Sequence, residues 1–207
     1  IMPSLVGSEM CIRDSYYMLN KPGGCVSAVK DNLYPTVLSF IENPKGYNLF
    51  PVGRLDLDTE GLLLITNDGT LAHELLSPKK HVTKTYFAKV QGRVTREDVQ
   101  RFSLGLDIKE EKPTLPATLV IEKSDDISEI RVSITEGKYH QVKRMFEAVG
   151  KQVLFLKRLS MGTLQLDESL TPGSYRALTT EELSALKNRT ISVSYTHLRA
   201  HETRHDL

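Results

Sequence analysis

Residues 53–69 read GRLDLDTEGLLLITNDG and place four charged side chains directly before one of the most apolar runs of the chain. A run such as LLLI is typical of a strand that is buried on both faces. Ionised groups at the start of such a strand are costly unless ion pairs or hydrogen bonds satisfy them. Asp56, Asp58 and Glu60 would share one side of an extended segment, whereas in a loop they would point apart. The stretch therefore predicts a buried strand whose charged approach has a specific partner or role.

Apolar periodicity and turn signals on both sides of this stretch predict strands that alternate with helices. Strands or extended runs are expected at 16–19, 48–55, 61–68, 84–92, 117–123, 127–135, 152–159 and 163–166. Helices are expected at 36–43, 70–77, 95–102, 139–150 and 179–187. The expected hairpin at 117–135 interrupts the alternation, which excludes a doubly wound arrangement. The predicted class is α+β, with a mixed, largely antiparallel sheet flanked by helices.

The two ends of the chain are related to each other at the level of DNA. Residues 9–14, written as GAG ATG TGT ATA AGA GAC, have a reverse complement that translates as VSYTHL, which is residues 193–198. Suitable codons extend this relation outward on both sides, and the central part resembles a transposase-type sequencing-library adapter. We therefore expect 1–15 and 192–207 to be non-native, adapter-like segments, with one domain at 16–191.

The composition bounds the class of protein. With 207 residues, 40% hydrophobic and 26% charged, the sequence is typical of a soluble globular protein. It has neither an apolar run of about 18 residues nor a signal-peptide pattern, so we expect a cytoplasmic protein without a membrane span. The motifs GxGxxG, GxxxxGK[ST], HExxH and GxSxG are absent, which argues against dinucleotide, P-loop, zincin and serine-hydrolase functions. Cys25 is expected to be a small buried residue.

Spacing alone leaves the role of the acidic stretch open. A solvated turn, with Asp58 and Thr59 bonded to nearby backbone, is the simplest interpretation. A glycosidase with two carboxylates is another, because two acids beside an apolar pocket can divide the acid and nucleophile roles. The basic residues of 139–150 and of PKKHVTKTY (78–86) either form solvated surfaces or neutralise phosphates. Tyr86 and Tyr139 between these basic residues suit RNA, where aromatic rings stack on unpaired bases.

Five motifs taken together resemble the RsuA-type branch of bacterial rRNA pseudouridine synthases. In chain order they are NKPGG, GRLDxDTEGLLLITNDG, KTY, EGKYHQVKRMFEAVG and GTLQLDESLTPGSYRALTTEEL. The resemblance covers essentially all of 16–188 and implies the catalytic fold of that family with a central RNA cleft. KYHQVKRMF is most similar to the enzyme that acts on the small-subunit rRNA, since large-subunit enzymes tend to carry an Arg-rich variant there.

The resemblance implies a role for each matching residue. Asp56 would be the catalytic aspartate, which attacks either the ribose C1′ or the uracil C6 so that the base detaches, rotates and rejoins through C5. Tyr86 would stack on the flipped uracil and help to remove the C5 proton. Lys143 would pair with Asp56 and keep the carboxylate ionised and oriented. Further RNA-binding residues would be Arg54, Lys84, Tyr139, His140, Gln141 and Arg144. Asp58 and Glu60 would cap the turn or orient Arg54.

The resemblance also implies partners. No metal and no cofactor is needed, and the expected partner of a monomeric enzyme is rRNA or a ribosomal-subunit assembly intermediate. Proteins of this branch usually carry an S4 RNA-binding domain before the catalytic domain, and we expect that domain to be missing here. The alternatives are a large-subunit rRNA pseudouridine synthase of the same branch and a non-catalytic protein for RNA binding or ribosome assembly.

Overall fold

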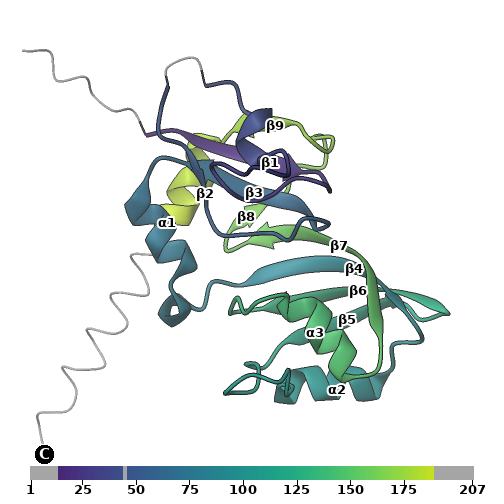
Figure 1. Cartoon of the computed structure of the whole chain (residues 1–207). Coiled ribbons are helices and arrows are strands. Elements are labelled where there is room, and N and C mark those ends of the chain that lie inside the picture. The colour runs from purple at the N-terminus through teal and green to yellow at the C-terminus, as the bar shows by residue number, and fades with distance from the viewer. Residues whose placement is uncertain (1–13, 44–45, 189–207) are drawn as a thin grey trace, which may run out of the picture.

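The computed structural model describes residues 14–43 and 46–188, and the adapter-like segments predicted at the two ends lie almost entirely outside this range. Figure 1 shows one continuous twisted sheet with helices packed against it. The strands are β1 (Tyr16–Lys21), β2 (Phe50–Pro51), β3 (Glu60–Thr66), β4 (Lys84–Gln91), β5 (Thr118–Lys123), β6 (Ile127–Ile134), β7 (Gln152–Met161), β8 (Leu164–Gln165) and β9 (Tyr175–Ala177). The α-helices are α1 (Gly69–Leu76), α2 (Arg96–Leu104) and α3 (Gln141–Ala148), followed by a closing helix at 180–188.

Within the described residues the sheet has nine strands in the order β5-β6-β4-β7-β3-β1-β9, with β2 added to β3 and β8 added to β7. All neighbouring strands are antiparallel except β3 and β7, which run parallel where Glu60 meets Lys157 and Gly61 meets Arg158. This short parallel contact joins the β5-β6-β4-β7 half of the sheet to the β3-β1-β9 half. The predicted class, α+β with a mixed and largely antiparallel sheet, is confirmed.

The LLLI run forms the centre of β3 and is buried on both faces of the sheet. Leu63 and Ile65 belong to the larger hydrophobic core, which includes buried residues of α2 and α3. Leu62 and Leu64 belong to a second core, which includes buried residues of α1. All four side chains have no exposed surface, so the prediction of a buried strand is confirmed.

Local capping chemistry explains the helix boundaries that the sequence predicted well. Asp68 caps α1 by accepting a hydrogen bond from the backbone N–H of Leu71 at 3.0 Å. Thr95 caps α2 in a capping box with Asp98, in which each side chain bonds the backbone of the other residue. Gly150 has a φ of 75°, the left-handed conformation that commonly follows the end of a helix such as α3.

Three predicted elements differ from the structure. The helix expected at 36–43 is only a 3₁₀ turn, η1 (Val37–Phe40), because Thr36 makes no side-chain cap and Val37 alone is buried. The extended run expected at 48–55 pairs only at β2, since Pro51 lacks an N–H for the ladder and Gly53 turns away with a φ of 81°. Strand β9 was not predicted from the sequence.

The helix expected at 139–150 is the third correction. It begins at Gln141, because His140 adopts a left-handed backbone with a φ of 47° that cannot continue a helix. Tyr139 and His140 therefore lie in the loop before α3, and they do not share helical faces with Lys143 and Arg144.

Candidate active site

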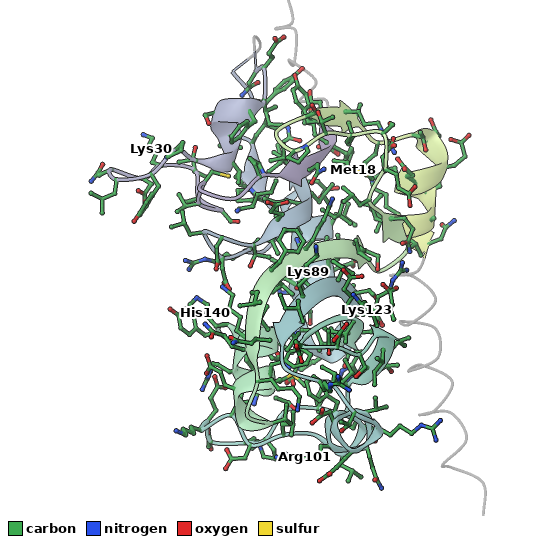
Figure 2. The ribbon with its side chains drawn as sticks, turned by 90° about the vertical axis from the view of Figure 1, so that its right-hand side faces the viewer. Met18, Lys30, Lys89, Arg101, Lys123 and His140 are labelled. Carbon is green, nitrogen blue, oxygen red and sulfur yellow. The ribbon has the colours of Figure 1, made fainter. Side chains whose placement is uncertain are left out.

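A cavity of about 640 Å³ opens beside the point where β3 approaches β7. Two segments form most of its wall, residues 53–57 in the loop before β3 and residues 134–143 at the start of α3. Strands β4 and β7 supply Lys84, Tyr86, Leu156 and Arg158. In Figure 2, His140 lies on the left side of the molecule, at a height between Met18 in the upper part and Arg101 at the bottom. Segments far apart in the sequence thus meet at one cavity.

Residues 56–59 form a tight turn that is held from below by a buried lysine. The N–H of Thr59 donates to Asp56 O at 3.1 Å, and the N–H of Gly24 donates to Leu57 O at 2.8 Å. Lys21 has no exposed surface, and its Nζ donates to Leu57 O at 3.3 Å and Thr59 O at 2.8 Å. Burial lowers the pKa of the Lys21 ammonium. The turn is therefore fixed by backbone contacts, and the Asp56 side chain is free to face the cavity.

One lysine of α3 contacts two of the three acids. Lys143 Nζ lies 3.2 Å from Asp56 Oδ2 and 2.6 Å from Asp58 Oδ1. Burial lowers the pKa of Lys143, but its hydrogen bonds to Asp58 and Asp56 outweigh burial and hold the pKa above its ordinary value. Burial raises the pKa of Asp58, and the bond from Lys143 outweighs this effect and leaves that pKa below its ordinary value. The site therefore holds one cation between two carboxylates.

Asp58 lies closer to Lys143 than Asp56 does, which the sequence did not predict. Its side chain is 72% exposed, whereas that of Asp56 is 26% exposed and lines the cavity. The structure places the Asp58 side chain on Lys143, and the expectation that Asp58 caps the turn or orients Arg54 stays a prediction.

His140 reaches the same carboxylate from the other side. Its Nε2 lies 3.5 Å from Asp56 Oδ1, and its ring stacks on the Tyr139 ring with 3.8 Å between centroids and 19° between planes. The left-handed backbone at His140 makes this approach possible, because it turns the side chain out of the path of α3. Tyr139 is 73% exposed, so this stacked pair presents an aromatic surface beside Asp56 at the edge of the cavity.

The other predicted residues that line the cavity are Tyr86, Lys84 and Arg54. Tyr86 is 8% exposed and lies in the wall that β4 contributes to the cavity. Lys84 is partly buried, and its Nζ makes a long hydrogen bond of 3.5 Å to Glu136 O. Arg54 is exposed on the loop before β3. Of these three, Tyr86 is the one placed deepest in the protein.

Gln141 and Arg144 have structural partners instead of free polar groups. Gln141 is 4% exposed, and its amide accepts from the N–H of Lys138 at 2.9 Å and donates to Glu136 Oε1 at 2.8 Å. The Arg144 guanidinium donates to Glu110, to Ile108 O and to Tyr139 O, and Arg144 is not among the residues that line the cavity. These contacts hold the loop before α3, and Gln141 also lines the cavity, so direct contact of Gln141 and Arg144 with RNA stays a prediction.

Sequence reasoning assigned no role to Lys21 or Arg158, which are buried beside the acidic turn. Lys21 ends an apolar strand directly before PGG, and Arg158 interrupts the apolar run LFLKRL. A charged residue within a buried strand was the available signal in both cases.

Comparisons with known proteins identify the family of the chain. The family model described as RNA pseudouridylate synthase matches residues 15–148. The "Uncharacterized RNA pseudouridine synthase YtzG" of Bacillus subtilis (strain 168) is 50% identical over 173 residues, which cover 83% of this chain and 72% of that protein. The "Ribosomal small subunit pseudouridine synthase A" of Escherichia coli (strain K12) is 43% identical over 172 residues, which cover 83% of this chain and 73% of that protein.

Solved structures give the same result. A structure titled "Crystal structure of pseudouridylate synthase" superposes with a TM-score of 0.78 at 43% identity, over 84% of this chain and 74% of that chain. The structure titled "Human RNA Pseudouridylate Synthase Domain Containing 1" shares the fold, with a TM-score of 0.52 at 18% identity over 84% of this chain and 91% of that chain. Among the residues that the structure describes, no helix is long and apolar enough to cross a membrane.

Proposed function

The chain belongs to the RsuA-type family of RNA pseudouridine synthases, and from this premise we propose that it converts a specific uridine of small-subunit rRNA to pseudouridine with Asp56 as the catalytic carboxylate. The observation that supports the choice of residue is the contact of 3.2 Å between Asp56 and Lys143 inside the cavity. A nearby cation favours the ionised carboxylate that a nucleophile requires.

The proposed reaction exchanges one bond to the base for another. The carboxylate of Asp56 attacks the ribose C1′ or the uracil C6, and the bond between C1′ and N1 breaks. The base turns, C5 bonds to C1′, and the bond that Asp56 formed to C1′ or C6 breaks and restores the free carboxylate. The proton on C5 is lost while N1 gains a proton. Tyr86, which lines the cavity, is placed to stack on the base and to assist the loss of the C5 proton. Atoms balance without an added reactant, because the product is an isomer of the substrate.

The remaining predicted residues have proposed roles at the edge of the cavity. The target base must leave its stack, which costs a few kcal/mol and is easiest in irregular RNA. Arg54 is exposed beside Asp56 and is placed to enter the RNA or to hold the phosphate of the flipped nucleotide. The stacked rings of Tyr139 and His140 offer an aromatic surface to an unpaired base. The small-subunit target is proposed because several relatives of 43–46% identity are named for that subunit.

A two-carboxylate glycosidase is not supported by the geometry. Such a site needs a second acid that faces Asp56 across a sugar-sized gap. Instead, Asp58 is bound to the same ammonium as Asp56, and that ammonium lies 3.2 Å from the Asp56 carboxylate.

The test uses rRNA labelled with tritium at uracil C5 and maps pseudouridine in the product. The parent protein should release tritium from small-subunit rRNA at one position, and Asp56→Asn should abolish release while RNA binding stays nearly unchanged. Asp126→Asn is the matched control, because Asp126 is exposed on the turn between β5 and β6, does not line the cavity and should leave activity unchanged. Equal activity of Asp56→Asn and the parent would refute the assignment, and pseudouridine found only in large-subunit rRNA would refute the target.

A further inference from the structure

Arg158 carries a buried charge that has no carboxylate partner among the described residues. It is 2% exposed in β7, and its Nε donates to Leu62 O at 2.8 Å. Its Nη2 is buried without any acceptor in the described part of the chain. Among the described residues, no carboxylate lies within salt-bridge distance of Arg158. A buried unpaired charge is among the most costly features of a protein interior, so it calls for an explanation.

A second cation, Lys84, lies on the neighbouring strand β4 and increases the cost. Lys84 is partly buried, and its Nζ donates to a backbone carbonyl at 3.5 Å. Both Lys84 and Arg158 line the cavity. Burial lowers the pKa of Lys84, the positive charge of Arg158 lowers it further, and the negative charge of Glu136 raises it without restoring the ordinary value. The cavity wall therefore carries positive charge that Glu136 offsets only in part, which suits an acceptor supplied by a ligand.

The position of Arg158 indicates which part of a nucleotide it meets. Arg158 and Tyr86 are register partners on the antiparallel strands β7 and β4, so their side chains leave the same face of the sheet. Both line the cavity and both are almost completely buried. A flipped nucleotide enters an active-site pocket base first, so its phosphates stay near the mouth and its base reaches the floor. Arg158 is therefore placed to meet a base edge.

We propose that Arg158 is a further catalytic residue, which donates a hydrogen bond to O4 of the target uracil and stabilises the negative charge that develops there. Guanidinium groups only donate hydrogen bonds, so Arg158 can donate to the O4 carbonyl of uracil but not to the amino group that cytosine carries at the same position. This inference rests on the proposed function and deepens it by naming the group that recognises the base.

The same contact serves both routes that are open for Asp56. If the carboxylate attacks C1′, the bond between C1′ and N1 breaks and its electron pair stays on the base, where conjugation spreads the charge from N1 to O4. If the carboxylate attacks C6, the electron pair of the C5–C6 double bond moves to give an enolate on O4. Electrons balance in both cases, and the charge returns to the ring when C5 bonds to C1′. A fixed cation at O4 lowers the energy of either intermediate.

The test combines variants of Arg158 with a change of the acceptor atom. Synthetic target RNA carries either uridine or 4-thiouridine at the modified position, with tritium at C5, because sulfur is a weaker hydrogen-bond acceptor than oxygen. For each protein we compare kcat/KM on the two substrates. This ratio does not depend on the folded fraction, so it remains informative even if Arg158→Met is less stable than the parent.

For the parent we expect a clear preference for uridine, and for Arg158→Met a loss of about 10²-fold on uridine and a several-fold smaller loss on 4-thiouridine, so that the preference shrinks. Arg158→Lys retains a cation, so its preference for uridine should lie between those of the parent and Arg158→Met. Arg131→Met is the control, because Arg131 lies exposed on β6 beside Glu122, and it should behave as the parent.

Three results are distinguishable. Equal losses on both substrates would overturn the inference and leave Arg158 as a structural residue. If a neutral methylphosphonate beside the target removes the difference between parent and Arg158→Met, while 4-thiouridine does not, the ligand is a phosphate and the inference is wrong. A parent that is inactive on the uridine substrate would refute the proposed function itself.

Discussion

At the scale of single residues, the site depends on an ammonium shared by two carboxylates of unequal exposure. Lys143 lies within 3.2 Å of Asp56 and 2.6 Å of Asp58, and Asp58 is largely exposed. Water screens an exposed ion pair strongly, so the contact with Asp58 contributes little to stability. The contact with the less exposed Asp56 is the one that fixes the geometry of the cavity.

We expect Lys143→Met to lower turnover by about 10²-fold, because Asp56 loses the group that orients it. The pKa of Lys143 is above its ordinary value of 10.5, so the ammonium persists as the pH rises through the alkaline range. The advantage of the parent over Lys143→Met should therefore stay constant between neutral pH and about pH 10, and decline only above it.

Tritium release measured across this pH range tests the prediction, with melting curves to confirm folding. Lys89→Met is the matched control, because Lys89 lies on the exposed side of β4 beside Glu129 and should leave activity unchanged. A gap that closes already near neutral pH would contradict the raised pKa, and the absence of any gap would contradict the orienting role.

The sequence predicted a side-chain contact where a family motif identified both residues, as for Asp56 and Lys143. It did not predict contacts that depend on the local backbone conformation. Asp58 and Lys143 are 85 residues apart, so no periodicity relates them, and only the family resemblance brought Lys143 to the acidic turn. The approach of His140 to Asp56 depends on one left-handed residue that no propensity indicates. The engagement of Arg144 with Glu110 likewise depends on a distant loop.

At the scale of elements, local chemistry predicts those boundaries that local chemistry determines. Asp68 and Thr95 cap α1 and α2, which begin within one residue of the helices predicted at 70–77 and 95–102. At η1, an equivalent threonine makes no cap, and the expected helix is not formed. Strand β3 was predicted from its apolar run, but its parallel contact with β7 was not, because tertiary packing alone brings these two strands together.

Gly61 makes the contact between β3 and β7 possible. It has a φ of 101°, and an added Cβ would lie 2.2 Å from the backbone oxygen of Arg158. We expect Gly61→Ala to destabilise the protein by more than about 1 kcal/mol, since both the backbone conformation and the space exclude a side chain. Urea unfolding measures this cost. Gly61→Ala should also lower activity below the melting temperature, because a shift of β3 moves the turn that carries Asp56.

Gly69→Ala is the control for this prediction. Gly69 is the first residue of α1, and an added Cβ there would meet nothing within 4 Å. Alanine favours helix over glycine, so this change should be neutral or slightly stabilising. Equal urea midpoints for the two variants would show that the close approach of β3 and β7 can relax at little cost.

At the scale of the whole molecule, the sequence predicted the class of the fold but not the order of its strands. Alternating patterns identify strands, whereas their neighbours in the sheet follow from packing across long separations. Strand β9 shows the difficulty, since Tyr175–Ala177 is too short for any alternation and forms a strand only because β1 lies beside it. A segment near the end of the described chain thereby forms the edge strand of the sheet beside β1.

An ion-pair network anchors this closing segment and gives it a dependence on pH. Arg176 of β9 donates to Asp167 at 2.7 Å and to both oxygens of Glu182 at 2.8 Å, and Glu182 also accepts from the N–H of Thr179 at the start of the closing helix. Hydrogen bonds from Ser169 and Arg176 lower the pKa of Asp167 from 3.8 to about 2. One arginine thus joins a loop, an edge strand and a helix.

The lowered pKa sets the pH at which this anchor is lost. A carboxyl whose pKa is lower in the folded state stabilises the protein above its unfolded pKa, and this contribution falls as the pH drops toward the folded value. Asp167→Asn should therefore reduce the free energy of unfolding at neutral pH, and its difference from the parent should shrink between pH 4 and about pH 2. Ser169→Ala removes hydrogen bonds that lower the pKa of the folded state, so the contribution of Asp167 should be smaller in this variant, and its loss should end at a higher pH than in the parent. Urea unfolding at a series of pH values gives the free energy of unfolding of all three proteins. Subtracting each variant from the parent removes the contributions that the other carboxylates make to both. A difference between Asp167→Asn and the parent that stays constant down to pH 2 would show that the network stabilises through packing instead of charge.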